Sequence, residues 1–447
     1  MPGASRSVAN TEARSSEGPL RAIQPPMGGG ASHEVKSMEV ISSADRPPLG
    51  GTAPSGGSAL HEVKSMGVTF AMVAGEPSGD LLAGLLLDGL KARWPTLTSY
   101  GIGGPQMASR GFQAWWPSEK LAVRGYVEVL RHYRGIVAIR KQLKSRLLDS
   151  CPDIFVGVDA PDFNLDLECA LKAKGIKTVH FVSPSIWAWR ADRVDKIRKS
   201  CDHVLCIFPF EPAILNAHGI SATYVGHPLA TVIPMRPDRA LARRKLGLDD
   251  ADTVIAILPG SRKSEIQYLG KRFFDAVLLV RRAQPAIKFI VPAIPLLKKI
   301  IQQLANEAGL QNELLILEGQ SHTVLAACDV TLIASGTATL EAALFKRPMV
   351  IAYNMNWLSW QIMRQKQLQP WVGLPNILCR DFVVPELLQD AATPAALAME
   401  LLRWIDAKSH ATDKITAVEQ RFTRLHTELL RPTSQLATDA IQKIIEG

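Results

Sequence analysis

The chain has 447 residues, 47% hydrophobic and 21% charged, which suits a globular protein with a sizeable core and two domains. No apolar stretch reaches the roughly 18–20 residues that span a bilayer, so we do not expect an integral membrane protein. The net charge of +9 favours polyanionic partners, but no nucleic-acid-binding motif accompanies it, and we expect no nucleic-acid partner.

The cysteines are scattered and form no C-x-x-C pair, which indicates a reduced, cytoplasmic chain without a disulfide framework or zinc site. We expect neither a metal nor a cofactor. The six cysteines are Cys151, Cys169, Cys201, Cys206, Cys328 and Cys379.

Residues 1–66 differ from the rest of the chain. They are rich in Gly, Pro, Ser and Ala, and the string HEVKSM at residues 33–38 recurs at residues 61–66. Such a duplication in low-complexity sequence is typical of a disordered segment or a misplaced start, and we place it outside the folded domains.

From residue 68 onward, apolar runs alternate with longer amphipathic stretches. The pattern predicts helices at 81–93 and 165–174 in the first half, and a first domain over residues 67–235. The predicted strands of this domain are residues 68–74, 99–101, 154–158, 177–182 and 204–207.

The second half repeats this alternation over residues 236–447. Strands that alternate with helices imply parallel sheets, so we predict an α/β protein with two doubly wound, Rossmann-like domains facing across a cleft. Helices after about residue 390 either cross back to the first domain or exchange between subunits. The second alternative would make the protein a homodimer. The predicted strands here are residues 253–258, 288–291, 314–317, 330–334 and 349–352.

Two Gly-rich loops, residues 259–262 and 335–341, each follow a predicted strand. A loop that enters a helix presents backbone N–H groups and the positive end of the helix dipole to an anion. We therefore expect a pocket for a nucleotide diphosphate, in which Arg262 binds phosphate and Glu341 accepts from ribose hydroxyls. The alternative is that both loops are ordinary turns without a ligand.

Asp159 and Asp162 are the best general acid–base candidates. Asp159 ends an apolar strand, where partial burial would raise its pKa, whereas Asp162 precedes a helix that it could simply cap. His180 and His227 are weaker candidates, because a lone histidine among apolar neighbours is usually a buried structural residue.

Three further patterns are poor functional signals. The turn at residues 75–80 lacks the lysine of a P-loop, and residues 101–104 form only a fragment of a dinucleotide fingerprint. Asp250 and Asp252 have the D-x-D spacing of metal-dependent glycosyltransferases, but they precede a strand and should lie at the wrong edge of the sheet.

Basic residues gather at 131–146 and again at 190–199. Most such clusters are solvated helix faces. The second follows Trp187 and Trp189, and indoles beside Arg190 suit either a membrane interface or a protein core.

Six strings along the chain together resemble the lipid-A-disaccharide synthase family of GT-B glycosyltransferases. They are AGEPSGD at 74–80, DAPDFN at 159–164, VSPSIWAWR at 182–190, LPGSR at 258–262, ASGTATLE at 334–341 and LPN at 374–376.

The resemblance implies a metal-independent, inverting transfer from UDP-2,3-diacylglucosamine to 2,3-diacylglucosamine 1-phosphate (lipid X), with Asp159 as the base. It implies acceptor contacts near Glu76, Ser78, Trp187, Trp189 and Arg190, and work at the anionic inner face of the cytoplasmic membrane. It implies donor contacts from Gly260, Ser261, Arg262, Ser335, Gly336, Thr337, Ala338, Thr339, Glu341 and Asn376.

Three alternatives remain at this point: another UDP-sugar protein such as a peptidoglycan-precursor glucosaminyltransferase or a UDP-N-acetylglucosamine epimerase, a nicotinamide-dependent oxidoreductase, and a binding protein without turnover.

Overall fold

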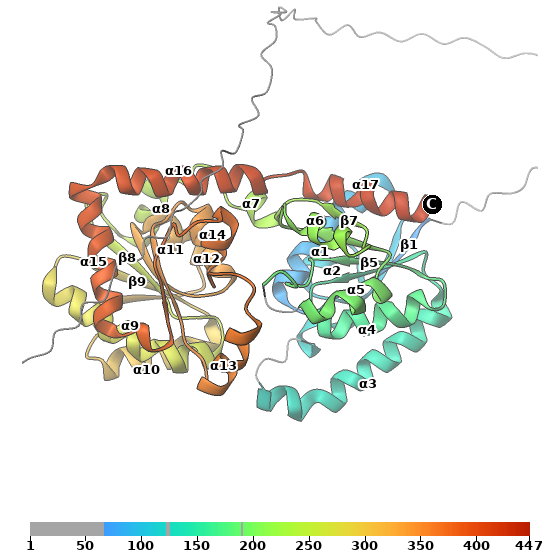
Figure 1. Cartoon of the computed structure of the whole chain (residues 1–447), viewed down its shortest axis with the longest axis horizontal. Coiled ribbons are helices and arrows are strands. Elements are labelled where there is room, and N and C mark those ends of the chain that lie inside the picture. Colours follow the sequence, from blue (N-terminus) through green and yellow to red (C-terminus); the bar gives the residue numbers. More distant parts are fainter. Residues whose placement is uncertain (1–66, 122–125, 189–190) are drawn as a thin grey trace, which may run out of the picture. The chain divides into compact units, whose positions relative to one another are not determined.

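The computed structural model describes residues 67–121, 126–188 and 191–447 (Figure 1). The expectation for residues 1–66 lies outside these described residues. Two sheets are present in the described part, and every strand pair in them is parallel. The predicted α/β class with two doubly wound parallel sheets is confirmed.

The first sheet has the strand order β3-β2-β1-β4-β5-β6-β7. Its strands are β1 (Thr69–Ala74), β2 (Thr98–Gly103), β3 (Gln113–Pro117), β4 (Ile154–Val158), β5 (Lys177–Phe181), β6 (His203–Cys206) and β7 (Ala222–Tyr224). The accompanying helices are α1 (Pro77–Arg93), α2 (Pro105–Ala108), α3 (Tyr126–Ser150), α4 (Pro161–Lys172), α5 (Val194–Ser200), α6 (Glu211–Ala217) and α7 (Pro228–Val232).

Helices cover both faces of this sheet because its central strands are apolar on both sides. In β1, Met72 joins the buried cluster that contains Leu86 of α1, while its neighbour Val73 joins the cluster that contains Leu143 of α3. The alternation of side chains along the strand therefore supplies two cores.

The second sheet has the order β10-β9-β8-β11-β12-β13. Its strands are β8 (Val254–Leu258), β9 (Lys288–Ala293), β10 (Leu314–Glu318), β11 (Val330–Ala334), β12 (Met349–Tyr353) and β13 (Glu386–Leu388). The helices are α8 (Arg239–Leu246), α9 (Lys263–Ala283), α10 (Lys298–Glu307), α11 (Ser321–Ala327), α12 (Thr337–Leu344), α13 (Trp357–Lys366), α14 (Leu374–Cys379), α15 (Pro394–His410), α16 (Thr412–Leu429) and α17 (Thr433–Glu446).

The sequence pattern predicts all the central strands within a few residues but does not predict β3, β7 and β13. These three are edge strands of three to five residues, and none of their residues is fully buried. They form because a neighbouring strand offers unpaired backbone groups. This is a tertiary effect, and no apolar run in the sequence predicts it.

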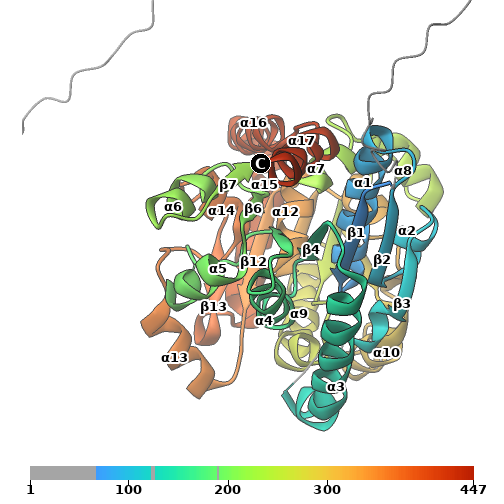
Figure 2. The ribbon, with the colours of Figure 1, turned by 90° about the vertical axis from the view of Figure 1, so that its right-hand side faces the viewer.

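The last helix, α17, returns to the first sheet and packs along α1 (Figure 2). The Arg93 guanidinium donates to the Asp439 carboxylate at 2.6 Å, and the Ser434 hydroxyl donates to the Leu85 carbonyl at 2.7 Å. Gly89 lies at the closest approach, where an added Cβ would sit 2.6 Å from the Ser434 carbonyl oxygen.

Among the described residues, no helix combines the length and the apolar character that crossing a bilayer requires.

Replacing Gly89 by Ala should lower the free energy of unfolding by about 1–3 kcal/mol, since the methyl group would force α17 away from α1. The matched control is Gly135→Ala in α3, where an added Cβ meets nothing within 4 Å. The control should be neutral or stabilising by up to about 1 kcal/mol, because alanine is the better helix former. Urea denaturation of both full-length variants measures the difference, and equal effects would contradict the close contact.

Candidate functional site

Each sheet has one point where the strand order reverses, between β1 and β4 in the first sheet and between β8 and β11 in the second. In open parallel sheets, ligands bind beyond the carboxyl ends of the strands at such a point. Leu258 at the end of β8 is in register with Ile333 near the end of β11, so the two Gly-rich loops leave the sheet side by side.

In the first loop, residues 259–262, a side-chain carboxylate of the protein itself already accepts from the backbone amides. The Glu265 carboxylate accepts from the backbone amides of Ser261 (2.8 Å) and Arg262 (3.2 Å) and contacts Nη1 of Arg262 at 3.1 Å. Gly260 has φ +129°, and an added Cβ would lie 2.5 Å from Cβ of Glu265, so this position needs glycine. The prediction that this loop presents its amides to a ligand is therefore corrected for Ser261 and Arg262, whose amides donate to Glu265.

Two other amide groups remain open at this loop. Lys263 and Ser264 are the first residues of α9, so their N–H groups have no partner within the helix. The Arg262 side chain is 55% exposed and can turn toward a ligand at the same edge.

The second loop is arranged similarly at the start of α12. The Ser335 amide donates to the Ala352 carbonyl at 2.9 Å, and the Thr339 hydroxyl donates to the Gly336 carbonyl at 2.7 Å. Thr337 and Ala338 are the first helical residues, and their amides point out of the helix end. Glu341 is partly exposed and lies 3.3 Å from Nε2 of His322.

Asn376 is placed differently from the expectation. Its amide group donates to the Val384 carbonyl and to the Glu386 carboxylate, both at 2.8 Å, while its oxygen accepts from the amides of Val383 and Val384. The side chain is fully buried. With every hydrogen-bonding position used inside the protein, Asn376 orders the segment before β13 and has none left for a nucleotide in this conformation.

The switch point of the first sheet brings together the loops that follow β1 and β4. Ala74 is in register with Val158, so the turn after β1, which leads through Glu76 into Ser78 at the start of α1, lies next to the loop of Asp159. Glu76 is the N-cap residue of α1, and Ser78 is exposed in its first turn. Asp80 is not among the predicted site residues. It is buried and accepts from the amides of Gly104, Gln106 and Met107.

Asp159 is half-buried directly after β4, with φ +52°, and Ala160 follows with φ +44°. Two successive non-glycine residues in the left-handed region cost about 1–3 kcal/mol each and are typical of functional sites. The Asp159 amide donates to the Phe181 carbonyl at 2.9 Å, and Nδ2 of Asn164 donates to the Asp159 carbonyl at 2.8 Å.

The suggested capping role of Asp162 is not observed. The N-cap residue of α4 is Ala160, without a side-chain hydrogen bond. Asp162 is 85% exposed and forms an ion pair with Arg193.

Trp187 lies in the core and does not face a membrane. It is 6% exposed, packs edge-on against Phe208 and Phe210, and donates from Nε1 to the Glu211 carboxylate at 3.0 Å. Burial raises the pKa of Glu211 to about 7. The Trp187 and Ala188 carbonyls accept from Gln369 and Leu368, which tether the loop from the other half of the chain. Trp189 and Arg190 lie outside the described residues.

The histidine candidates are both buried. Nδ1 of His180 pairs with Glu168 at 2.7 Å, and Nδ1 of His227 accepts from the Leu229 amide at 3.2 Å. Burial lowers the pKa of His227 to about 4. Asp252 precedes β8 at the opposite edge of the sheet, where it pairs with Lys288, as the sequence position predicts.

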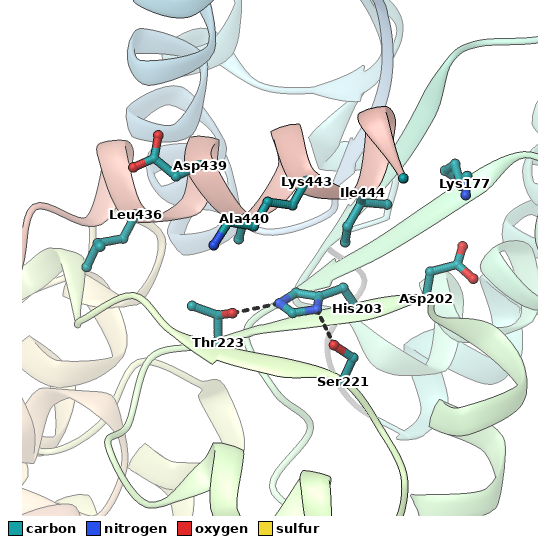
Figure 3. A pocket seen from close by; sticks show the side chains of 11 residues that line it. Lys177, Asp202, His203, Ser221, Thr223, Leu436, Asp439, Ala440, Lys443 and Ile444 are labelled. Carbon is teal, nitrogen blue, oxygen red and sulfur yellow. Dashed lines mark hydrogen bonds between the residues drawn. The ribbon is translucent and has the colours of Figure 1, made fainter.

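A hollow of about 540 Å³ lies at the opposite edge of the first sheet, between α17 and the starts of β5, β6 and β7 (Figure 3). Within it, His203 pairs with the hydroxyls of Ser221 (2.8 Å) and Thr223 (2.9 Å). None of the predicted site residues that the structure describes lines this hollow, so it is separate from the candidate site.

Comparison with known proteins gives one consistent family. A family model described as lipid-A-disaccharide synthetase matches residues 70–443. The lipid-A-disaccharide synthase of Albidiferax ferrireducens is 71% identical over 378 residues, which cover 84% of this chain and 97% of the relative. The protein of the same name from Burkholderia pseudomallei is 52% identical over 381 residues, with coverage of 84% and 96%.

Solved structures agree at the level of fold. UDP-GlcNAc 2-epimerase from Neisseria meningitidis bound to UDP-GlcNAc matches with a TM-score of 0.56 at 12% identity, covering 85% of this chain and all of that one. MurG from Acinetobacter baumannii matches with a TM-score of 0.52 at 13% identity, covering 84% and 99%. These likenesses show the two-domain α/β architecture of GT-B glycosyltransferases.

Because the family model spans almost the whole described chain and the full-length relatives carry one name, this chain belongs to the lipid-A-disaccharide synthase family of glycosyltransferases.

Proposed function

We propose that the protein transfers the 2,3-diacylglucosaminyl group of UDP-2,3-diacylglucosamine to the 6-hydroxyl of 2,3-diacylglucosamine 1-phosphate, with inversion and without a metal ion. One observation carries the proposal: the two loops that present helix-end amides lie at the switch point of the second sheet, and Asp159 lies at that of the first. This division suits a reaction that joins a nucleotide-linked donor to a second sugar.

The donor side uses the loops after β8 and β11. The open amides of Lys263, Ser264, Thr337 and Ala338 suit a diphosphate at two helix N-termini. Glu341 is partly exposed in the first turns of α12, and in this proposal it accepts from the ribose hydroxyls.

In the chemical step, Asp159 takes the proton of the acceptor hydroxyl while that oxygen attacks the anomeric carbon. The bond between this carbon and the diphosphate oxygen breaks, and UDP leaves with the electron pair. Arg262 and the loop amides stabilise the charge that develops on the diphosphate, which is the role that a metal ion has in other glycosyltransferases.

Disaccharide formation in EDTA by the full-length protein, beside the variant Asp159→Asn, tests the proposal. Wild type should form product from the two named substrates. Asp159→Asn should lower kcat by about 10²–10⁴-fold, because the amide cannot accept the proton, while UDP binding stays unchanged. Near-normal turnover of a folded Asp159→Asn would contradict the base assignment. UDP binding by wild type without product would favour the epimerase or binding-protein alternatives.

Glu265 must leave the first loop if a diphosphate is to use the amides of Ser261 and Arg262. Replacing it by glutamine removes a negative charge that competes with the ligand, while the shape of the loop is kept. UDP affinity of Glu265→Gln should rise by about threefold to tenfold, which corresponds to roughly 0.7–1.4 kcal/mol. Calorimetric titration with UDP measures the change, and weaker binding would show that Glu265 supports the ligand-ready loop.

We also propose that the protein is cytoplasmic and attaches peripherally to the inner face of the cytoplasmic membrane, because both proposed substrates carry acyl chains. With Trp187 buried, helix α13 supplies the apolar surface. Trp357 is 69% exposed and Ile362 is 52% exposed, and Arg364 and Lys366 are exposed in the last turn. Exposed apolar side chains close in sequence to exposed basic side chains suit contact with an anionic membrane surface. Because α13 follows β12, it starts from the same edge of the sheet as the nucleotide loops.

The double variant Trp357→Ser/Ile362→Ser should lower binding to vesicles of phosphatidylglycerol and phosphatidylethanolamine by about tenfold, because apolar burial in the lipid is lost. Added salt should weaken wild-type binding, since Arg364 and Lys366 contribute by charge. Met399→Ser on α15, where the methionine is 47% exposed, is the matched control. Vesicle flotation that changes with neither the variant nor salt would contradict attachment through α13.

A further inference from the structure

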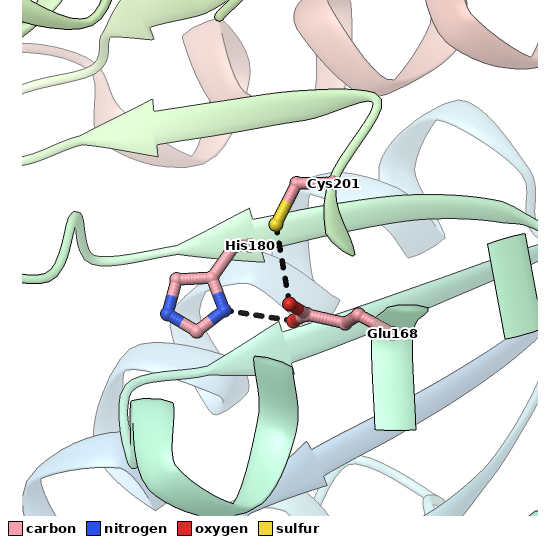
Figure 4. Close-up of side chains that lie close together, drawn as sticks. All are labelled: Glu168, His180 and Cys201. Carbon is pink, nitrogen blue, oxygen red and sulfur yellow. Dashed lines mark hydrogen bonds and ion pairs between the residues drawn. The ribbon is translucent and has the colours of Figure 1, made fainter. Parts of the chain in front are cut away.

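A cluster of three buried polar side chains lies among α4, β5 and the end of α5, and the mechanism does not use it (Figure 4). It consists of Glu168 on α4, His180 on β5 and Cys201 just after α5, and none of the three is more than 4% exposed. Glu168 Oε1 lies 2.7 Å from Nδ1 of His180, and the Cys201 thiol donates to Glu168 Oε2 at 3.2 Å. Burial raises the pKa of the Cys201 thiol well above its usual range, so the thiol stays a donor.

The cluster contacts β4, the strand that directly precedes Asp159. His180 is in register with Gly157, and an added Cβ on Gly157 would lie 2.1 Å from Glu168 Oε1. The carboxylate therefore lies against the backbone of β4 two residues before Asp159.

Glu168 lies on α4 and His180 lies on β5, and these two elements also hydrogen-bond the backbone of Asp159. Phe181, which follows His180 on β5, accepts from the Asp159 amide at 2.9 Å. Asn164, one turn before Glu168 on α4, donates to the Asp159 carbonyl at 2.8 Å. The left-handed backbone of Asp159 and Ala160 depends on these outside contacts.

We propose that Glu168 and His180 are positioning residues: by joining α4 to β5 they fix Asn164 and Phe181 on either side of Asp159 and hold its carboxylate toward the acceptor. This inference rests on the proposed role of Asp159 as the base. An apolar pair could fill the same space without the desolvation cost of burying Glu168 and His180. The polar pair adds a directional hydrogen bond between α4 and β5, which apolar packing would not supply.

The test compares Glu168→Leu, which removes the bond to His180, with Glu168→Gln, whose side-chain oxygen still accepts from Nδ1–H. Cys201→Ala is the control inside the same cluster. Glu168→Leu should lower kcat by about 10–100-fold, because small misplacements of reacting groups have effects of this size, while UDP affinity is unchanged. Glu168→Gln should recover activity to within a few-fold of wild type, and Cys201→Ala should stay close to it. Glu168→Gln also keeps the test informative if Glu168→Leu does not fold.

A double-mutant cycle with Asp159→Asn separates this inference from the proposed function. If Glu168 acts through Asp159, Glu168→Leu should cost little further turnover in the Asp159→Asn background. If Asp159→Asn is inactive and Glu168→Leu lowers turnover by the same factor in that background as in wild type, the positioning role is wrong and the proposed function is unaffected. An active Asp159→Asn would overturn both.

Metal content gives an independent check. Glutamate, histidine and cysteine side chains within 4.8 Å of one another are also a ligand set for a transition metal. Elemental analysis should find the same zinc content in the purified wild-type protein and in Glu168→Gln. About one zinc per chain that depends on Glu168 would overturn the positioning role.

Discussion

The rest of the structure depends on one constraint, which is that each parallel sheet reverses its strand order once. Between β1 and β4, and again between β8 and β11, neighbouring helices lie on opposite faces, and the loops at the carboxyl ends separate to leave room for a ligand. The apolar strands that are buried on both faces fix where these points lie. The proposed chemistry lies in these loops because they, unlike the strands, are not buried on both faces.

The two switch points differ in what they present. The second offers backbone amides at two helix ends, with Arg262 nearby, and suits an anion. The first offers the Asp159 carboxylate on a strained turn that a buried polar cluster supports. A glycosyl transfer needs both environments, one to stabilise the leaving diphosphate and one to accept a proton.

Much of this arrangement could be predicted from the sequence, because apolar runs mark central strands and Gly-rich strings mark their loops. What could not be predicted depends on tertiary contacts. The edge strands β3, β7 and β13 have no apolar run, and the burial of Trp187 depends on the distant Phe208, Phe210 and Glu211. Asn376 matches the family pattern, yet its bonds are all internal. Glu265 stands three residues after Arg262, the N-cap residue of α9, and this capping-box spacing is a sequence signal that predicts its bonds to the loop amides.

If donor and acceptor bind at different switch points, hydrogen–deuterium exchange with UDP should change at only one of them. UDP should slow exchange in peptides that cover residues 259–264 and 335–341, where the open helix-end amides would bind the diphosphate. Peptides that cover residues 75–80 and 159–164 should be unchanged by UDP alone. Protection of the first-sheet loops, with none at 259–264 and 335–341, would show that UDP does not bind at the switch point of the second sheet.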